Sequence, residues 1–407
     1  MDKKETQYDV AILGLWWSSN YGSIMTYYSL YRLIESFGKR VVVIDRPVLP
    51  PDQQFFDTDG RRFQKEHFPV TPIFSLEDLG KLNEYAQCFV MGSDQVWNFG
   101  ISEKYCGAFF LKFVQDDRKK LSYAASFGHP GFYASEEEIQ ETKKLLERFD
   151  GISVREIDAV RIMNQTFGLK ADRVLDPIFA VNPDIFKTLM SQSRAAKRKL
   201  PESYLCTYIL DPTPEKREAI QYLADKKGLP MIHMLDGYQE YFEENKEKFA
   251  MEGVVEDLKV EDWLYYLYHC DFLLTDSCHG ASFAILFQKD FVCIGNASRG
   301  LPRFESLANV FHMEDRFVYD AAEIPKRREL LKEIDFTESE HILQKERARS
   351  RKWLKDHLDA PIRKEKHNHY EPPKPLWKKA AVKSYQIFLK PFLSEGKKAK
   401  IRERFRR

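Results

Sequence analysis

Residues 270–287 read CDFLLTDSCHGASFAILF. The stretch opens with a short apolar run, continues with small and polar residues, and ends with a second apolar run. A short apolar run of the first kind is typical of a strand buried on both faces of a sheet. Small polar residues directly after it are typical of a helix start. The stretch therefore predicts a strand, a loop and a helix, the unit from which parallel sheets are built.

The same unit recurs along the chain. Residues 10–15 (VAILGL) predict a strand, residues 24–38 a helix, and residues 41–45 (VVVID) a second strand. The other predicted strands cover residues 88–94, 121–128, 151–156, 174–179, 203–211, 230–235 and 290–296. Because these runs alternate with helical segments, we predict an α/β fold with two Rossmann-like domains.

A polar, basic stretch over residues 190–203 interrupts the alternation and is typical of a linker between domains. We therefore expect an N-terminal domain over residues 1–192 and a C-terminal domain over residues 200–337. Residues 338–370 begin with the pattern of a charged helix, which we expect to pack across both domains. A basic tail, residues 371–407, completes the chain.

The charge of the chain is unevenly distributed. The 407 residues are 43% hydrophobic, enough for two domain cores, and the net charge of +1 argues against nucleic acid as a partner. From Glu371 to Arg407, however, twelve Lys and Arg residues stand against three Glu, so this tail carries +9 and residues 1–370 carry −8. The tail is therefore expected to have a partner of its own.

The tail has the pattern of a basic amphipathic helix. Apolar residues recur about one helical turn apart among lysines, at Trp377, Ala381, Tyr385, Phe388 and Phe392. Such a helix can lie on an anionic membrane surface. A solvated terminus is the alternative interpretation.

The cysteines and the N-terminal sequence predict the compartment. Six cysteines are scattered without regular spacing, which favours free thiols and no metal site. The N-terminal residues lack the pattern of a secretory signal, and no apolar run approaches 18 residues. We therefore expect a cytoplasmic protein, with the tail at the inner face of the membrane if it binds lipid.

Four loops follow the predicted strands and are rich in small and polar residues: 18–23 (SSNYGS), 92–98 (GSDQVWN), 154–158 (VREID) and 276–282 (DSCHGAS). Ligands of open parallel sheets bind at the carboxyl ends of the strands, so these loops are the candidate site. None of the four matches a dinucleotide or P-loop motif.

The last of these loops predicts an anion site. Ser277 and Gly280 fall where a helix begins, so free backbone N–H groups and the helix dipole would face a ligand there. His279 could bind the anion or transfer a proton near neutral pH. The alternative is that Ser277 only caps the helix and His279 makes a local hydrogen bond. A nucleophilic role for Cys278 is disfavoured, because adjacent residues point in different directions.

The other loops supply a cation and the walls of a crevice. Arg155 directly follows a strand and is placed to grip phosphate or carboxylate, or to pair with Glu156 or Asp158. Further candidates are Arg299 and Arg303, which follow the last strand and are either ligand-binding or surface cations. The candidate crevice residues are Asn20, Gly22, Gly92, Ser93, Asp94 and Trp97, with Trp97 either stacking on a sugar or half-buried in a turn.

Taken together, these stretches resemble the polysaccharide pyruvyl transferase family. The matching pieces occur in family order between about residues 8 and 310: NYGS followed by a long helix, GSDQVWN, SYAASFG, ISVRE, VLDPIF and TDSCHGASFAILF. Beyond about residue 320 the sequence departs from the family pattern.

The resemblance implies a fold like that of the GT-B glycosyltransferases, with a cleft between the two domains. It implies phosphoenolpyruvate as the donor, two hydroxyls of one sugar as the acceptor, and a cyclic ketal and phosphate as products. Such sugars belong to capsules, exopolysaccharides or wall polymers, or to their lipid-linked precursors. His279 and Arg155 map onto the family's donor-associated residues, and no other cofactor is implied.

These expectations assign roles to the candidate residues. We expect His279 and Arg155 to be catalytic, Ser277, Gly280 and Arg303 to bind the donor, and the crevice residues of the N-terminal domain to face the acceptor. Two alternatives stay open: a nucleotide-sugar glycosyltransferase of the same fold, and a non-catalytic sugar-binding or scaffold protein of polysaccharide assembly.

Overall fold

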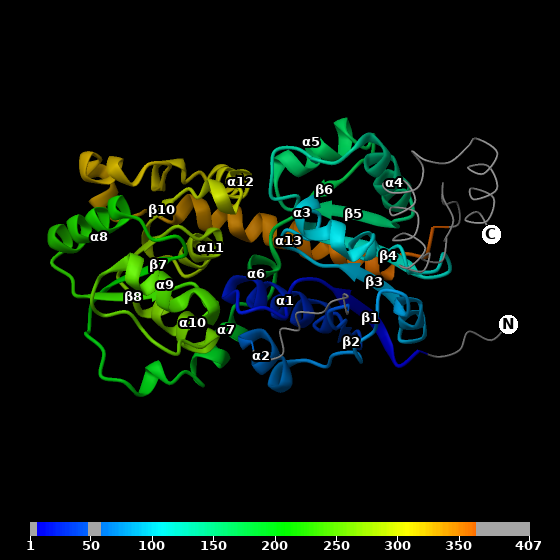
Figure 1. Cartoon of the computed structure of the whole chain (residues 1–407), viewed down its shortest axis with the longest axis horizontal. Helices are drawn as coiled ribbons and strands as arrows, with labels where there is room; N and C mark the ends of the chain where they lie inside the picture. Colours follow the sequence, from blue (N-terminus) through cyan, green and yellow to red (C-terminus); the bar gives the residue numbers. More distant parts are fainter. Residues whose placement is uncertain (1–5, 48–57, 364–407) are drawn as a thin grey trace, which may run out of the picture.

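The computed structural model describes residues 6–47 and 58–363, which form two halves side by side, each built on a parallel sheet (Figure 1). The predictions for the tail, residues 371–407, lie outside the described residues. No described helix combines the length and hydrophobicity needed to cross a membrane.

The first half holds a six-stranded sheet in the order β2-β1-β3-β4-β5-β6. Its strands are β1 (Tyr8–Leu13), β2 (Val41–Val43), β3 (Ala86–Met91), β4 (Lys119–Ala125), β5 (Gly151–Val154) and β6 (Asp172–Arg173). Its helices are α1 (Tyr21–Glu35), α2 (Asp59–His67), α3 (Phe99–Ser102), α4 (Glu136–Leu146) and α5 (Ile157–Gln165). All seven residues of β4 are buried, as expected for a strand covered on both faces.

The second half holds a five-stranded sheet in the order β11-β10-β9-β7-β8. Its strands are β7 (Leu205–Ile209), β8 (Met231–Leu235), β9 (Phe272–Thr275), β10 (Asp290–Ile294) and β11 (Phe317–Val318). Its helices are α8 (Pro214–Lys227), α9 (Gln239–Phe249), α10 (Val260–His269), α11 (Cys278–Leu286) and α12 (Leu301–Phe311).

The strand order reverses once in each sheet, between β1 and β3 and between β7 and β9. In open parallel sheets such a switch point leaves a crevice at the carboxyl ends of the strands. The loops that follow β1, β3, β7 and β9 are therefore the ones positioned to bind a ligand.

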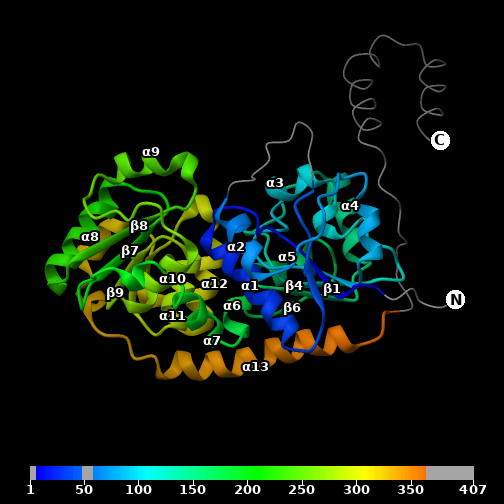
Figure 2. The same ribbon diagram turned by 90° about the horizontal axis from the view of Figure 1, so that it is seen from below.

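The chain passes between the halves twice. The first passage runs through α6 (Pro177–Ala180), which packs on α1, and α7 (Asp184–Met190), which packs on α10. The second leads into α13 (Thr337–Asp359), which extends along both halves (Figure 2). At one end of α13, Gln288 donates to Glu340 over 3.1 Å, and at the other Trp353 donates to Asp172 over 2.9 Å.

The structure confirms the predicted α/β fold with two sheets and corrects several elements. Residues 174–179 were expected to form a strand, but Asp176 caps α6 and Pro177 is its first residue, because proline suits the first turn of a helix. Helix α1 begins at Tyr21 rather than Ile24, since the side chain of Asn20 accepts from the backbone N–H of Ser23. Helices α2, α9 and α12 were missed.

Candidate active site

A cleft of about 290 Å³ lies between the two halves, at the carboxyl ends of both sheets. The first half contributes the loop after β1, the loop after β3 and the residues after α3, and the second half contributes the loops after β7, β8, β9 and β10. The polar lining residues are Ser18, Asn20, Ser23, Asp94, Gln95, Lys104, Asp276, Ser277, His279, Arg299 and Arg303, and the aromatic ones are Trp17, Tyr105 and Tyr238.

His279 lies at the boundary between the halves, in the first turn of α11. Its ring packs against α1 at Gly22, where even a single methyl group would come within 2.3 Å of Cγ and Nδ1. The Nε2 atom is 3.2 Å from the Thr26 hydroxyl on the same face of α1. Gly22 therefore serves to bring α1 against the histidine, and it does not line the cleft itself.

Burial determines the protonation of His279. The residue is only 6% exposed, and this burial lowers the pKa of the imidazole to about 4, against the opposing effect of Asp94 and Asp176. In the ligand-free protein the imidazole is thus neutral at pH 7. A neutral imidazole can accept a proton from a substrate hydroxyl.

The start of α11 is held in place from both sides. The Ser277 side chain accepts from the Gly280 N–H over 3.3 Å and caps the helix; Ser277 also lines the cleft, and its role in donor binding stays a prediction. Gly280 packs so closely on Thr275 that an added Cβ would lie 2.5 Å from its hydroxyl. The buried Asp276 carboxylate accepts from Lys216 and from the Leu210 N–H, which ties the loop to the second sheet.

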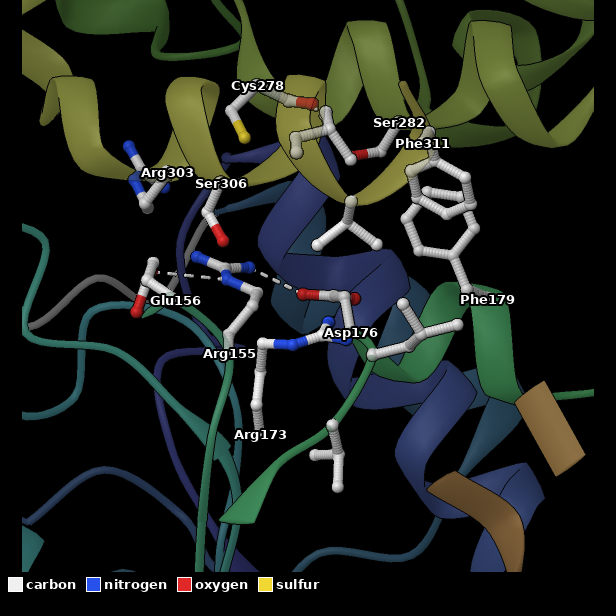
Figure 3. A pocket seen from close by; sticks show the side chains of 14 residues that line it. Arg155, Glu156, Arg173, Asp176, Phe179, Cys278, Ser282, Arg303, Ser306 and Phe311 are labelled. Atoms are coloured by element: carbon white, nitrogen blue, oxygen red, sulfur yellow. Dashed lines mark hydrogen bonds and ion pairs between the residues drawn. The ribbon is translucent and has the colours of Figure 1, made fainter. Parts of the chain in front are cut away.

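Arg155 lies beside a smaller cavity of about 40 Å³, which shares Arg303 and Cys278 with the cleft. Figure 3 shows its guanidinium between the carboxylates of Glu156 and Asp176. Burial disfavours its charge, but Asp176, Glu156 and Asp94 together raise the pKa of the guanidinium above its usual value. The expected pairing with Glu156 is therefore present, whereas Asp158 pairs with Arg161 instead.

Arg303, from α12, brings a second cation to the same place. Its Nη1 lies 3.4 Å from Asp94, and the Arg155 Nη2 lies 3.6 Å from the same carboxylate. Burial acts to raise the pKa of Asp94, but His279, Arg155 and Arg303 outweigh it and lower the pKa. Arg299, by contrast, pairs with Asp211 and Asp236 at the edge of the cleft.

Both arginines keep unused donors. Neither the Arg155 Nη2 nor the Arg303 Nε has a hydrogen-bond acceptor among the described residues, although both atoms are buried. At the nearby start of α11, the backbone N–H groups of Cys278 and His279 also have no acceptor in the described part of the chain. Buried cationic donors without acceptors are costly, so this region is suited to an anionic ligand.

Three further expected crevice residues, besides Gly22, have structural roles instead. Trp97 has no exposed surface: its ring stacks on Phe110 at a centroid distance of 5.8 Å and it donates to the Phe109 carbonyl, so it offers no face to a sugar. Gly92 makes room for the Tyr27 ring, which an added Cβ would approach to 2.4 Å. Ser93 is buried and donates to Asp176. Asn20 and Asp94 do line the cleft.

The sequence interpretation missed two residues that contact the candidate catalytic groups. Asp176 was hidden in a segment taken for a strand, although an Asp followed by Pro is a recognisable helix start. Thr26 lies in the interior of α1 and gave no signal. Cys278 is buried among the same groups, and burial raises the pKa of its thiol, which argues against a nucleophilic role.

Two parallel sheets that face each other across such a cleft define the GT-B fold. The structure is similar to a glycosyltransferase from Rickettsia africae ESF-5, with a TM-score of 0.52 and 9% identity, over 87% of this chain and 99% of that one. It is also similar to the UDP-GlcNAc 2-epimerase from Neisseria meningitidis bound to UDP-GlcNAc, with a TM-score of 0.51 and 10% identity, over 86% and 98% of the two chains. At these identities the likeness shows the fold alone.

The chain belongs to the polysaccharide pyruvyl transferase family, whose model matches residues 20–298. The match spans the cleft from the cap of α1 to the loop after β10. It makes the protein an enzyme of polysaccharide pyruvylation. No curated protein matches the chain at a significant level.

Proposed function

We propose that the protein transfers the three-carbon unit of phosphoenolpyruvate to two hydroxyls of one sugar in a cell-surface polysaccharide or its lipid-linked precursor, forming a cyclic ketal and releasing phosphate. The observation that supports this most directly is the pair of unused guanidinium donors, on Arg155 and Arg303, beside the cleft lined by His279. Phosphoenolpyruvate carries both a phosphate and a carboxylate, and each suits a guanidinium.

The donor is proposed to bind where the cleft meets the smaller cavity. Arg303 and Cys278 line both spaces, and Arg155 lies just behind them. The guanidinium groups, with the free N–H groups at the start of α11, would hold the two anionic groups and offset the charge on the departing phosphate. The acceptor sugar would then occupy the wider part of the cleft, between Asn20 and Trp17 of the first half and Tyr238 of the second.

The proposed reaction removes one proton from each of the two sugar hydroxyls, and both protons must be accounted for. The trianion of phosphoenolpyruvate and the sugar diol become the ketal carboxylate and HPO₄²⁻. One hydroxyl proton ends on the methylene carbon, which becomes the methyl group, and the other leaves with phosphate. The C2–O bond to phosphate breaks, and two C2–O bonds to the sugar form. We assign to His279 the acceptance of the proton from an attacking hydroxyl, because its imidazole is neutral.

The test is to incubate the full-length protein with phosphoenolpyruvate and a panel of nitrophenyl and lipid-linked sugars, and to follow phosphate release. We expect release with at least one acceptor, and its loss in His279→Ala and Arg155→Ala. His269→Ala is the matched control, since this histidine is exposed at the end of α10, where its ring contacts those of Tyr265 and Tyr268.

The outcomes separate the alternatives. No release with any acceptor, together with no binding of phosphoenolpyruvate, would overturn the proposal. Binding of a uridine or guanosine diphosphate sugar in its place would identify a glycosyltransferase. If His279→Ala and Arg155→Ala both retained the protein's activity in cells, the non-catalytic alternative would stand.

We further propose that the enzyme acts at the inner face of the membrane, where lipid-linked acceptors are found. This rests on the sequence of residues 371–407, with its net charge of +9. Sedimentation with anionic liposomes tests it, comparing the full chain with a variant that ends at residue 370. Equal sedimentation of the two proteins would contradict the proposal.

A further inference from the structure

A chain of hydrogen bonds connects His279 to a buried carboxylate that the reaction above does not use. The His279 Nε2 lies 3.2 Å from the Thr26 hydroxyl, which in turn lies 3.3 Å from Oδ1 of Asp176. All three residues are buried, with exposures of 6%, 0% and 4%. Each hydrogen in this chain therefore has a limited choice of acceptors.

Asp176 accepts four hydrogen bonds. Its Oδ1 accepts from Thr26 and from the Ile178 N–H, and its Oδ2 accepts from Ser93 and from Arg155. A carboxylate has about four such positions and no hydrogen to give. The Thr26 hydroxyl therefore donates to Asp176, because a hydrogen bond to an ionised acceptor is stronger than one to a neutral nitrogen.

We propose that Thr26 and Asp176 are positioning residues that fix the tautomer of His279, so that Nε2 carries the hydrogen and Nδ1 is the atom that takes the substrate proton. A hydroxyl has a single hydrogen, and Thr26 donates it to Asp176. Its oxygen can then only accept, which requires a hydrogen on Nε2. The neutral ring is left with its lone pair on Nδ1.

The surroundings of Nδ1 agree with this role. Among the described residues the His279 ring makes its one hydrogen bond through Nε2, which leaves Nδ1 unpaired, and His279 lines the cleft where the acceptor is proposed to bind. When Nδ1 accepts a proton, the resulting imidazolium lies near the carboxylates of Asp94 and Asp176, which oppose the effect of burial on its pKa. Asp176 thereby orients both proposed catalytic groups, Arg155 directly and His279 through Thr26.

The inference rests on the proposed function for the role of Nδ1, but the tautomer itself can be measured without substrate. Full-length protein with ¹⁵N-labelled histidine is recorded in long-range ¹H–¹⁵N spectra of the imidazoles at pH 7. The chain has ten histidines, and the signal lost in His279→Gln assigns the relevant ring. We expect a neutral ring with hydrogen on Nε2. Hydrogen on Nδ1, or a charged ring, would overturn the inference.

Substitution of Thr26 provides the second readout. Thr26→Val keeps the shape of the side chain and removes the hydroxyl, so we expect His279 to become a mixture of tautomers. We also expect kcat to fall about tenfold, which corresponds to the loss of one hydrogen bond, with little change in KM for phosphoenolpyruvate. Thr26→Ser keeps the hydroxyl and should retain the wild-type tautomer and the wild-type kcat. The control is Ser29→Ala, which removes another buried hydroxyl of α1, one that has no hydrogen-bond partner among the described residues.

The outcomes distinguish this inference from the proposed reaction. An unchanged tautomer in Thr26→Val overturns the inference, whatever happens to the rate. An Nε2–H ring that depends on Thr26, in a protein that releases no phosphate from phosphoenolpyruvate, supports the hydrogen-bond chain and refutes the reaction alone. If Thr26→Val does not fold, the wild-type spectrum and the Thr26→Ser variant still decide the question.

Discussion

The contact between Gly22 and His279 makes a quantitative prediction for a single added methyl group. In Gly22→Ala, the new Cβ would lie 2.3 Å from Cγ and Nδ1 of the imidazole. Carbon atoms pack at about 3.5 Å, so the ring must move away from α1 by about 1 Å. Thr26 lies on the same face of α1, and the same movement would therefore break the 3.2 Å contact between its hydroxyl and Nε2.

We expect this substitution to reduce activity far more than stability. A displacement of about 1 Å at a catalytic group can cost about 100-fold in rate. Overpacking costs about 1–3 kcal/mol, but replacing glycine by alanine in a helix returns about 0.5–1 kcal/mol. The free energy of unfolding should thus fall by no more than about 2.5 kcal/mol, while kcat falls about 100-fold. Phosphate release and urea denaturation measure the two quantities.

Gly100→Ala is the matched control for this experiment. Gly100 is the second residue of α3, just as Gly22 is the second residue of α1, and each helix is capped by an asparagine. A Cβ at Gly100 would meet its nearest atom at an ordinary 3.5 Å. If Gly22→Ala retained wild-type kcat, or if both variants lost activity equally, the assignment of His279 as a catalytic group held by α1 would be refuted.

Three further predictions follow from buried residues. Arg155→Ala leaves the Asp176 and Glu156 carboxylates without their cation, so we expect the free energy of unfolding, measured in urea, to fall by about 3–5 kcal/mol. We also expect calorimetry to detect no binding of phosphoenolpyruvate, and a variant of wild-type stability would contradict this prediction. Trp97→Ala should destabilise the fold by about 3–5 kcal/mol without changing KM for the acceptor, whereas a raised KM at unchanged stability would restore the sugar-stacking role. Burial lowers the pKa of His233 from 6.5 to about 4. Between these two pH values the unfolded chain binds a proton that the folded protein does not, so the free energy of unfolding falls as the pH falls. The stability advantage of wild type over His233→Gln should therefore shrink by about 2 kcal/mol between pH 7 and pH 5, and a constant difference would show that His233 is not neutral in the fold.

The fold was predictable because its strands are covered on both faces. Buried strands such as β2 and β9 are apolar at nearly every position, and polar residues of a loop follow soon after each. This regularity also located the candidate loops, since strand ends in a parallel sheet converge on one edge. His279, Arg155, Arg303 and Asp94 were all found in this way.

The partners of these residues were not predictable from local pattern. Thr26 lies in the middle of α1, and its hydroxyl meets Asp176 and His279 only because α6 and α11 both pack near this helix. The direction of Trp97 was also undetermined, because a residue after a strand can turn to the cleft or to the core. Packing against aromatic residues distant in sequence, such as Phe127 and Phe149, places the Trp97 side chain in the core.

The two passages of the chain between the halves limit how the cleft can open. One lies between α6, which packs on α1, and α7, which packs on α10, and the other is α13 itself, which packs on α12 and on α6. Two crossings of the chain oppose sliding of one half past the other, so a hinge rotation is the motion that we expect to open the cleft. Such a rotation would separate α1 from α11, and would thus part Thr26 from His279. Opening the cleft to admit a sugar would in this way also free the His279 ring. Thr26 would then orient the proposed base only when the cleft is closed.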